Sequence, residues 1–253
     1  MDLFDLSGRN ALITGSARGL GKTIAHSLAS YGATVILNDI DKQKLTETVQ
    51  EFQQQNLKVD SEIFDVTNEE QIRSGIENIV KRFSKIDILV NNAGINRRAP
   101  IVEMTVEDWD AVLTVNLKSI FLVSRTVAPH MIEKGVGKII NMASLLSEGA
   151  RPTIAAYTAS KGAVKMLTKS MAIEWAEHNI QVNGIGPGYF KTEMNLALVQ
   201  DPEFNKWVLS KTPAKRWGEL DDLRGVAIFL ASAASDFING QIIYVDGGWL
   251  AAL

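Results

Sequence analysis

The fold class follows from the stretch Ala11-Leu12-Ile13-Thr14-Gly15-Ser16-Ala17-Arg18-Gly19-Leu20-Gly21, in which a short apolar run leads through a glycine-rich turn into a helical pattern. Glycines allow a tight turn, and without a Cβ they let a phosphate approach backbone N–H groups at the positive end of the helix. Close packing of the helix against the turn would favour the same glycines. The strand–turn–helix context favours a nucleotide-binding crossover.

Short apolar runs alternate with amphipathic stretches along the rest of the chain. Continuous apolar strands separated by helices predict a parallel sheet covered on both faces. We therefore expect a single α/β domain over 1–253, a Rossmann-like doubly wound parallel sheet of about seven strands with helices on both faces. The expected strands are 11–14, 34–37, 61–64, 88–90, 138–141, 181–183 and 242–245. The expected helices lie near 20–31, 41–55, 69–84, 106–134, 155–178 and 219–232.

Residues 189–218 fit this alternation poorly. They contain two prolines and several large aromatic residues, namely Phe204, Trp207 and Trp217. We expect this segment to cover the substrate site.

Composition and charge exclude several classes of protein. The 253 residues carry a net charge of −3 with no basic stripe, so we expect no nucleic-acid partner. The sequence has no cysteine, and its three histidines are isolated, so no metal site is expected. The N-terminus lacks the pattern of a secretory signal, and no apolar segment is expected to reach membrane-spanning length. We expect a cytoplasmic protein with no membrane partner.

A carboxylate follows the second expected strand. Asp39 lies about 20 residues beyond the glycines, where it can accept hydrogen bonds from both hydroxyls of an adenosine ribose. Such a carboxylate repels a 2′-phosphate, so NAD is expected in preference to NADP. Arg18 opposes this preference, because a cation in the turn partly neutralises a 2′-phosphate, and NADP stays open. Asp39 would also suit the N-cap of the following helix.

Three side chains are expected to meet at the carboxyl end of the sheet. Ser144 closes a strand-like run, and Tyr157 and Lys161 lie four apart in a helical pattern, so both project from one helix face. A free phenol titrates at about pH 10, and a neighbouring ammonium lowers its pKa. The phenol can then take a proton from an alcohol while hydride leaves the carbon. A Tyr and a Lys at this spacing are common on helices, so the pair gains weight only from its context.

In order and spacing, these motifs resemble those of the short-chain dehydrogenase/reductase family across essentially the whole chain. The matching residues are Thr14-Gly15-x3-Gly19-x-Gly21, Asn91-Asn92-Ala93-Gly94, Asn116, Ser144, Tyr157-x3-Lys161, Pro187-Gly188-x3-Thr192 and Asp246-Gly247-Gly248. The resemblance implies an oxidoreductase that moves hydride between NAD(P) and a secondary alcohol or ketone. A non-catalytic nucleotide-binding protein is the alternative of another class, but it would not need the proton-transfer residues.

The resemblance also implies roles for single residues. Tyr157 would be the general acid/base, and Ser144 would hydrogen-bond the reacting oxygen. Lys161 would hold the nicotinamide ribose, and Asn116 would position a water that links Lys161 to solvent. A satisfied helix Asn and a simple strand end are the alternatives for Asn116 and 91–94. The cofactor-binding residues, besides Tyr157 and Lys161, would be Gly15, Arg18, Gly19, Leu20, Gly21, Asp39, Asp65, Val66, Asn92, Ala93, Gly94, Pro187, Gly188, Phe190 and Thr192.

Two arginines on loops beside the expected cleft favour an acidic substrate. Arg98 follows the fourth expected strand, and Arg151 lies on the loop after Ser144. A guanidinium can hold a carboxylate through two parallel hydrogen bonds, although either arginine would equally suit a solvated surface. We expect Arg98, Arg151 or both to bind a sugar-acid carboxylate and Glu148 to bind its hydroxyls. Ser144 and Tyr157 would contact the reacting oxygen.

Several stretches resemble one branch of the family, the gluconate 5-dehydrogenases (5-keto-D-gluconate reductases). They are Asn96-Arg97-Arg98, Ser147-Glu148, 162–168, 188–194 and Thr212-Pro213-Ala214-x-Arg216-Trp217-Gly218. The resemblance implies D-gluconate and 5-dehydro-D-gluconate as the substrate pair. The 2-dehydro-3-deoxy-D-gluconate 5-dehydrogenases, or another polyol or ketone dehydrogenase, stay the alternative. The family further implies a homotetramer with contacts from the long helices near 106–134 and 155–178.

Overall fold

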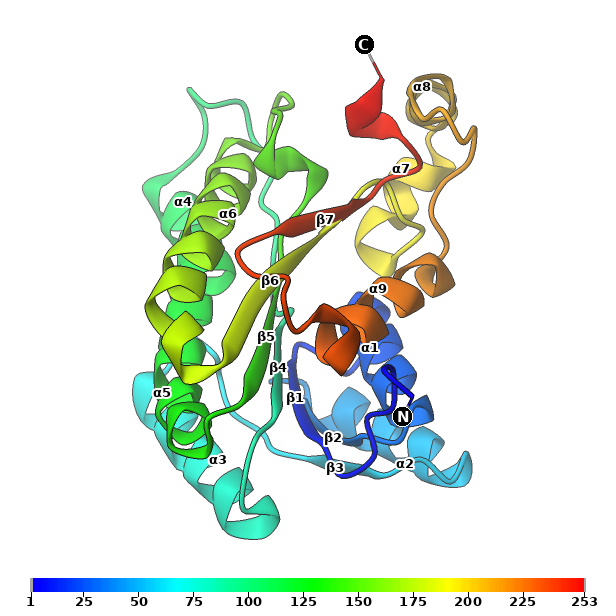
Figure 1. Ribbon diagram of the computed structural model, residues 1–253. Helices are drawn as coiled ribbons and strands as arrows, with labels where there is room; N and C mark the ends of the chain where they lie inside the picture. The colour runs from blue at the N-terminus through cyan, green and yellow to red at the C-terminus, as the bar shows by residue number, and fades with distance from the viewer. Residues whose placement is uncertain (1, 253) are drawn as a thin grey trace.

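Seven parallel strands form one sheet in the computed structural model, which describes residues 2–252 (Figure 1). The strands lie in the order β3-β2-β1-β4-β5-β6-β7, and every neighbouring pair is parallel. The expected doubly wound parallel sheet is confirmed. The strand bounds are β1 Asn10–Thr14, β2 Thr34–Asn38, β3 Val59–Ser61, β4 Ile88–Asn91, β5 Gly137–Met142, β6 Ile180–Pro187 and β7 Ile242–Val245.

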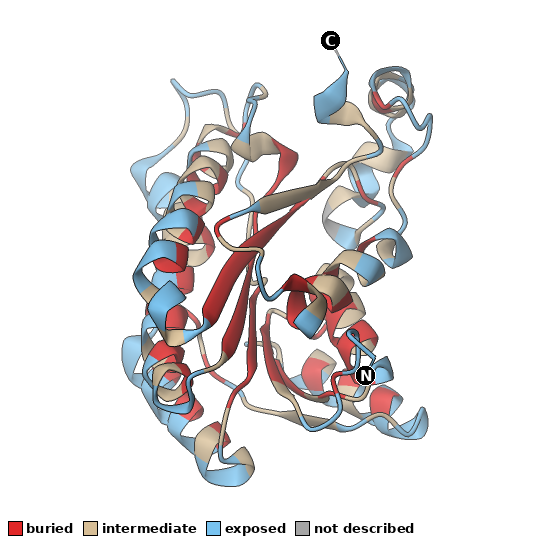
Figure 2. Ribbon diagram, viewed as in Figure 1, coloured by how far each residue is buried: buried red, intermediate tan, exposed pale blue. Residues whose placement is uncertain are grey.

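Helices cover both faces of this sheet (Figure 1). Helices α1, α2 and α9 lie on one face, and α3, α4, α5 and α6 lie on the other. In Figure 2 the helix sides turned toward the sheet are buried, whereas the outer sides are exposed. The helix bounds are α1 Gly19–Ser30, α2 Lys42–Gln54, α3 Glu69–Phe83, α4 Val106–Leu113, α5 Ser119–Lys134, α6 Ala155–Trp175, α7 Leu196–Gln200, α8 Pro202–Lys211 and α9 Arg224–Ala231.

The central strands are apolar because both of their faces are covered. Every residue of β4, β5 and β6 is buried. Successive side chains point to opposite faces, so Ile13 and Val90 join the core on the α1 side, whereas Leu12 and Leu89 join the core on the α3 side. Two apolar clusters, one on each face, therefore hold the sheet in place.

The strand order reverses between β1 and β4, which start the two halves of the sheet. At such a point the following helices leave toward opposite faces, and a crevice opens at the carboxyl ends of the strands. The glycine-rich turn follows β1, and Ser144 follows β5, so both lie at this edge. The fold places the expected cofactor and catalytic residues together.

The third strand lies earlier than the sequence predicts. It is Val59–Ser61 rather than 61–64. Phe64 is buried under α3 instead, so close that a Cβ on Gly75 would lie 2.6 Å from the ring. The N–H of Glu62 still donates to the carbonyl of Leu37, and the side-chain amide of Asn38 donates to the carbonyls of Glu62 and Phe64. Phe64 thus packs against a helix and does not extend the strand, while Ile63 is exposed.

The expected helix at 106–134 is continuous but changes its winding. The π-helical turn η1 (Thr114–Lys118) joins α4 to α5. The run Val106–Lys134 is long and apolar enough to cross a membrane by length and composition, so the expectation that no apolar segment reaches that length is wrong. Half of its most apolar window is buried, because residues such as Val123 and Val127 pack on the sheet.

The segment 189–218 forms two short helices, α7 and α8, at the carboxyl ends of β6 and β7 (Figure 1). Asp201 begins α8 as its N-cap, because the carboxylate accepts from the N–H groups of Glu203 and Phe204. Pro202 at the first helical position adds a suitable φ without losing a hydrogen bond. This segment therefore adds helical structure beside the crevice.

Two helical glycines should respond in opposite ways to substitution by alanine. Alanine favours a helix by about 1 kcal/mol over glycine. At Gly225 an added Cβ would meet nothing within 4 Å in residues 2–252 apart from the adjacent backbone of its own helix, so Gly225→Ala should raise the free energy of unfolding by roughly 0.5–1 kcal/mol. Gly75→Ala overpacks Phe64 and should lower it by roughly 1–3 kcal/mol. Urea unfolding measures both, and a stable Gly75→Ala variant would contradict the packing described for Phe64.

Candidate active site

The glycine-rich turn between β1 and α1 lies against the end of β4. Gly15 has a φ of +61°, and a Cβ there would lie 2.8 Å from the Cα of Ala93. A Cβ on Gly21 would lie 2.3 Å from the carbonyl oxygen of Gly15. The Asn92 Nδ2 donates to the carbonyls of Thr14 at 3.0 Å and Gly15 at 2.7 Å. The turn therefore requires glycine at both places and is held by Asn92.

The first turn of α1 is open to an anion. The helix begins at Gly19, and within the described residues the N-cap side chain of Arg18 makes no capping hydrogen bond. Gly19 has a φ of +56°, and apart from the adjacent backbone nothing in residues 2–252 lies within 4 Å of a Cβ built on it. Free N–H groups and the positive helix end therefore fit the diphosphate of a dinucleotide cofactor.

Asp39 is tied to the backbone on both sides of its strand end. Its carboxylate accepts from the N–H of Ala17 at 3.2 Å and from the N–H of Asp41 at 3.1 Å. Asp41 is the N-cap of α2, since its carboxylate accepts from the N–H of Lys44, so the alternative that Asp39 caps this helix is wrong. Asp39 thus fixes the glycine-rich turn relative to β2.

Two cations beside Asp39 share one carboxylate. An oxygen of Glu193 lies 3.6 Å from an Arg18 nitrogen and 4.0 Å from the Lys44 ammonium. All three line a cavity of about 560 Å³ between α1, α2 and the segment after β6. The region around the expected adenosine ribose therefore offers both a carboxylate and two positive charges.

Ser144, Tyr157 and Lys161 meet beside the end of β5, as expected. Ser144 precedes the short 3₁₀ turn η2 (Leu145–Ser147), and the other two lie on the first turns of α6. The Ser144 hydroxyl accepts from the N–H of Leu146 at 3.2 Å and lies close enough to the Tyr157 phenol to lower its pKa. The Lys161 ammonium lies 5.6 Å from the centre of the Tyr157 ring and donates to the carbonyl of Met142 at 2.5 Å.

Burial dominates the pKa values of these groups. It raises the pKa of Tyr157, against the opposing effects of the Ser144 hydrogen bond and the Arg98 charge. Burial also lowers the pKa of Lys161 to about 8. The expected lowering of the Tyr157 pKa is wrong for the chain without a bound cofactor, because burial of the phenol raises the pKa and Lys161 is not among the groups that lower it. A protonated phenol suits proton donation to a developing alkoxide.

Asn116 lies fully buried in the π-helical turn η1. Its Oδ1 accepts from the N–H of Ile95 at 2.8 Å, and its Nδ2 donates to the Ile95 carbonyl at 2.9 Å and to the Ser160 hydroxyl at 3.2 Å. The side chain is therefore a satisfied buried amide that ties the loop after β4 to α6. Single π turns are frequent at functional sites. The role of Asn116 in a water relay stays a prediction.

The remaining expected cofactor residues lie along the same edge of the sheet. Asp65 folds back on its own loop and accepts from the N–H and the hydroxyl of Thr67, each at 2.8 Å. Gly188 passes β7 so closely that a Cβ would lie 2.7 Å from the Cα of Asp246. The others follow the ends of β1, β3, β4 and β6, and they are Leu20, Val66, Ala93, Gly94, Pro187, Phe190 and Thr192.

Arg98 and Arg151 lie on two loops that are joined by a backbone hydrogen bond. The N–H of Ala99 donates to the carbonyl of Thr153 at 2.9 Å. Burial and the neighbouring charge of Arg151 lower the pKa of Arg98, and interactions with Tyr157 and Tyr189 oppose this. The structure therefore brings Arg98 within range of charge interactions with Arg151 and with the Tyr157 phenol.

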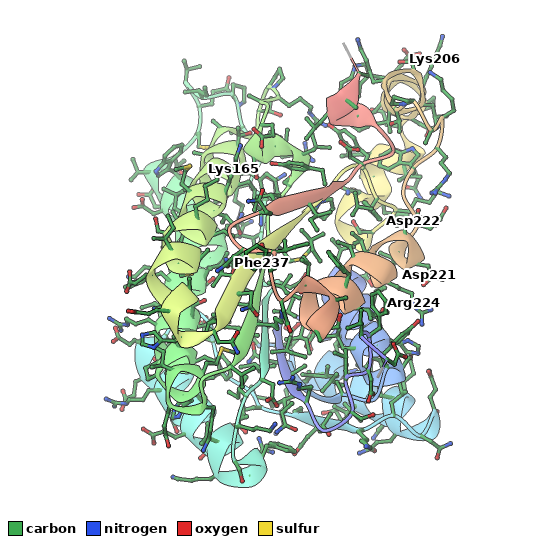
Figure 3. All side chains as sticks on the ribbon, in the orientation of Figure 1. Lys165, Lys206, Asp221, Asp222, Arg224 and Phe237 are labelled. Carbon is green, nitrogen blue, oxygen red and sulfur yellow. The ribbon has the colours of Figure 1, made fainter. Side chains whose placement is uncertain are left out.

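The Glu148 carboxylate contacts side chains of α6 and β7, away from the two arginines. Its carboxylate accepts from the Lys165 ammonium and from the Tyr244 hydroxyl, each at 2.5 Å. These contacts lower the pKa of Glu148. Figure 3 shows Lys165 on the outer side of α6. The structure engages Glu148 between α6 and β7 and does not bring it to the arginines.

The chain matches known proteins along its whole length. A family model described as enoyl-(acyl carrier protein) reductase matches residues 15–250. The 5-keto-D-gluconate 5-reductase of Escherichia coli is 50% identical over 252 residues, which cover 100% of this chain and 99% of the relative. The chain belongs to the short-chain dehydrogenase/reductase family.

Two further relatives of this short-chain dehydrogenase/reductase span it end to end. A solved structure described as a gluconate 5-dehydrogenase from Burkholderia cenocepacia in complex with NADP and tartrate is 52% identical, with a TM-score of 0.97, and covers 100% of this chain and 99% of that one. The 2-dehydro-3-deoxy-D-gluconate 5-dehydrogenase of Formosa agariphila is 45% identical over 255 residues, which cover 100% of this chain and 97% of the relative. The chain is an NAD(P)-dependent oxidoreductase that transfers hydride.

Two residues of the short-chain dehydrogenase/reductase site were not among those expected to act there. The Thr14 hydroxyl accepts from the N–H groups of Asn92 at 3.0 Å and Ala93 at 3.2 Å, and so aligns β4 with the glycine-rich turn. Its place at the head of the glycine motif is the signal that could have identified it. The Tyr189 hydroxyl accepts from Arg151, a contact between distant loops for which the sequence carries no signal.

The pKa of Lys161 predicts how its burial affects stability at different pH values. The pKa is about 8 in the folded chain against an ordinary 10.5, so between these values the unfolded state binds more protons. The contribution of this group to the free energy of unfolding should therefore rise with pH, by up to about 1.4 kcal/mol per unit. Urea unfolding of wild type and Lys161→Met from pH 8 to 10 should diverge in favour of wild type.

Lys169→Met is the matched control, because Lys169 lies exposed on the same helix. Its stability should follow the wild-type pH profile. Parallel profiles for wild type and Lys161→Met would show that the Lys161 ammonium is not buried as described.

Proposed function

We propose that this enzyme interconverts 5-dehydro-D-gluconate and D-gluconate. The observation that carries the proposal is the pair of arginines Arg98 and Arg151 on two loops that the hydrogen bond from Ala99 to Thr153 joins, with Arg98 close enough to Tyr157 for their charges to interact. Among residues 2–252, no carboxylate lies within 4.0 Å of either guanidinium, whereas the adjacent Arg97 pairs with Asp108 at 3.7 Å. Cations that no protein carboxylate neutralises favour a substrate that itself carries a carboxylate.

The relatives support a sugar acid as that substrate. The Escherichia coli relative is named for 5-keto-D-gluconate, and the Burkholderia relative for gluconate. Tartrate, bound in the latter structure, is a small hydroxylated dicarboxylate. A hydroxylated carboxylate fits two unpaired guanidinium groups for the same chemical reason.

Side chains of the protein transfer the proton of the reaction. A bound nicotinamide supplies hydride in reduction and accepts it in oxidation. Tyr157 donates its phenolic proton to the ketone oxygen in reduction and takes it back in oxidation, and Ser144 hydrogen-bonds the same oxygen. Lys161 holds the cofactor ribose beside the phenol. One proton and one hydride thus convert the ketone into the alcohol.

The alternative is a 2-dehydro-3-deoxy-D-gluconate 5-dehydrogenase, supported by the 45% identical relative. Both substrates carry a carboxylate, so the arginines do not distinguish them. The two alcohols, D-gluconate and 2-dehydro-3-deoxy-D-gluconate, differ at carbons 2 and 3, and a direct comparison of their oxidation separates the proposals. A non-catalytic nucleotide-binding role is disfavoured by the complete set of Ser144, Tyr157 and Lys161.

We propose that both NAD and NADP serve as cofactor. The carboxylate of Asp39 favours NAD, while Arg18 and Lys44 favour a 2′-phosphate, and Asp39 is already engaged by two backbone N–H groups. The Burkholderia relative was solved with NADP. The preference for NAD expected from Asp39 stays a prediction.

We also propose a cytoplasmic homotetramer, in line with the family resemblance. Large apolar side chains are exposed along α4, α5 and α6, among them Trp109, Phe121 and Met166. A groove of about 380 Å³ between these helices is lined by residues including Leu117, Phe121 and Leu167. A second copy covering this face would remove that surface from water. Light scattering measures the subunit number directly.

The cofactor proposal predicts opposite effects for two variants. Asp39→Asn removes a charge but keeps a hydrogen-bond acceptor, so the ratio of kcat/KM for NADPH over NADH should rise. Arg18→Ala should lower that ratio by about tenfold, because it removes charge-assisted hydrogen bonds to the 2′-phosphate. Arg73→Ala, on the exposed side of α3, is the matched control and should leave the ratio unchanged. An unchanged ratio in both test variants would place cofactor selection elsewhere.

The substrate proposal predicts a loss that depends on the carboxylate. In the double variant Arg98→Ala, Arg151→Ala, the KM for 5-dehydro-D-gluconate should rise by about 10- to 100-fold, because hydrogen bonds between charged groups are lost. L-Sorbose carries CH₂OH in place of that carboxylate, so its kcat/KM should stay nearly constant. Nicotinamide absorbance follows both reactions, with 2-dehydro-3-deoxy-D-gluconate as the third substrate.

Tyr157→Phe is the control for chemistry, because it should nearly abolish turnover while cofactor still binds. A wild-type KM for 5-dehydro-D-gluconate in the double arginine variant would refute the carboxylate site. In the oxidative direction, a higher wild-type kcat/KM for 2-dehydro-3-deoxy-D-gluconate than for D-gluconate would favour the alternative.

A further inference from the structure

Four aromatic rings surround Tyr189 at the carboxyl ends of β6 and β7. The centre of the Tyr189 ring lies 5.8 Å from the ring centre of Phe204, 5.7 Å from that of Trp207, 5.7 Å from that of Trp217 and 4.9 Å from that of Trp249. Phe204 and Trp207 come from α8, whose outward side carries Lys206 (Figure 3). We refer to these five residues as the aromatic cluster. It joins α8 and the segment after β7 to the end of β6.

Arg151 reaches this aromatic cluster from the loop after η2. Its guanidinium carbon lies 4.5 Å from the centre of the Phe204 ring and 6.0 Å from that of Trp207. An Nη1 hydrogen donates to the Tyr189 hydroxyl at 3.2 Å. Aromatic faces attract a guanidinium but leave its charge intact.

The contacts of Arg151 restrict its motion without neutralising it. A free arginine side chain loses considerable rotamer entropy when it binds a ligand. Here two rings and one hydroxyl already hold the planar group, and a single acceptor leaves most of its five N–H donors free. The group is therefore arranged in advance for an incoming anion, which lowers the cost of binding.

Arg98 completes the arrangement from the neighbouring loop. The backbone hydrogen bond from Ala99 to Thr153 fixes the two loops relative to each other. Arg98 interacts with the charge of Arg151 and with both Tyr157 and Tyr189. The direction in which Arg151 faces thus decides whether the two cations act on the same carboxylate.

We infer that Tyr189 is a positioning residue for substrate specificity, whose hydroxyl orients the Arg151 guanidinium toward the substrate carboxylate beside Arg98. The inference rests on the proposed function, because it assumes a carboxylate at this place. It assigns the segment 189–218 a second task besides covering the site, since α8 supplies the rings on which Arg151 lies.

Tyr189→Phe tests this inference because it keeps every ring contact and removes only the hydroxyl. The KM for 5-dehydro-D-gluconate should rise about three- to tenfold, as expected for one hydrogen bond to a charged group. The kcat, the KM for the cofactor and the kcat/KM for L-sorbose should change less than twofold. Tyr31→Phe is the matched control, because Tyr31 is a half-exposed phenol at the end of α1.

A double-mutant cycle separates positioning from direct contact with the substrate. In an Arg151→Ala background, Tyr189→Phe should have no further effect on the KM. An equal rise in both backgrounds would mean that the hydroxyl binds the substrate itself, and the inference would be overturned. Titration of tryptophan fluorescence with D-gluconate gives the same comparison without turnover, because Trp207 and Trp249 lie in the cluster.

The cycle also distinguishes failure of this inference from failure of the proposed function. If Arg151→Ala and Arg98→Ala both leave the KM unchanged, the carboxylate site is wrong, and the inference falls with it. If Arg151→Ala raises the KM but Tyr189→Phe does not, only the role of Tyr189 is wrong.

Discussion

The close approach of the glycine-rich turn to the end of β4 is the constraint on which the site depends. A Cβ at Gly21 would meet the Gly15 carbonyl at 2.3 Å, and Asn92 bonds two carbonyls of the turn. This contact joins the two halves of the sheet where the strand order reverses. It also directs the free N-terminus of α1 into the crevice. Without it, neither the diphosphate position nor the neighbouring catalytic edge would be defined.

The two sides of the crevice are built differently. The cofactor side consists of strand ends and turns whose backbone is fixed by the sheet, as in the ladder between β1 and β4. The substrate side consists of two loops, helix α8 and the residues after β7, which meet through aromatic rings and the contacts of Arg151. The aromatic and Arg151 contacts of the second side join its own loops and α8 to one another. The same fold can therefore accept different hydroxy acids.

Local pattern predicted the fold well, and it predicted that Tyr157 and Lys161 lie near Ser144, since strand runs, glycines and the four-residue spacing on a helix are short-range features. The errors concern long-range contacts. Phe64 is apolar because it packs under α3 and not because it belongs to a strand, and burial sets the direction of the Tyr157 pKa shift. The aromatic contacts of Arg151 join residues 38 or more positions apart, which no spacing rule covers. Family resemblance supplied the roles that physics alone left open.

The unneutralised arginines have a practical consequence for handling the enzyme. Two adjacent guanidinium groups without a carboxylate partner among residues 2–252 attract multivalent anions of any origin. Sulfate, phosphate or citrate in a storage or assay buffer would compete for the same place, whereas chloride would compete weakly. Kinetic constants measured in different buffer salts would then differ even at equal pH and ionic strength.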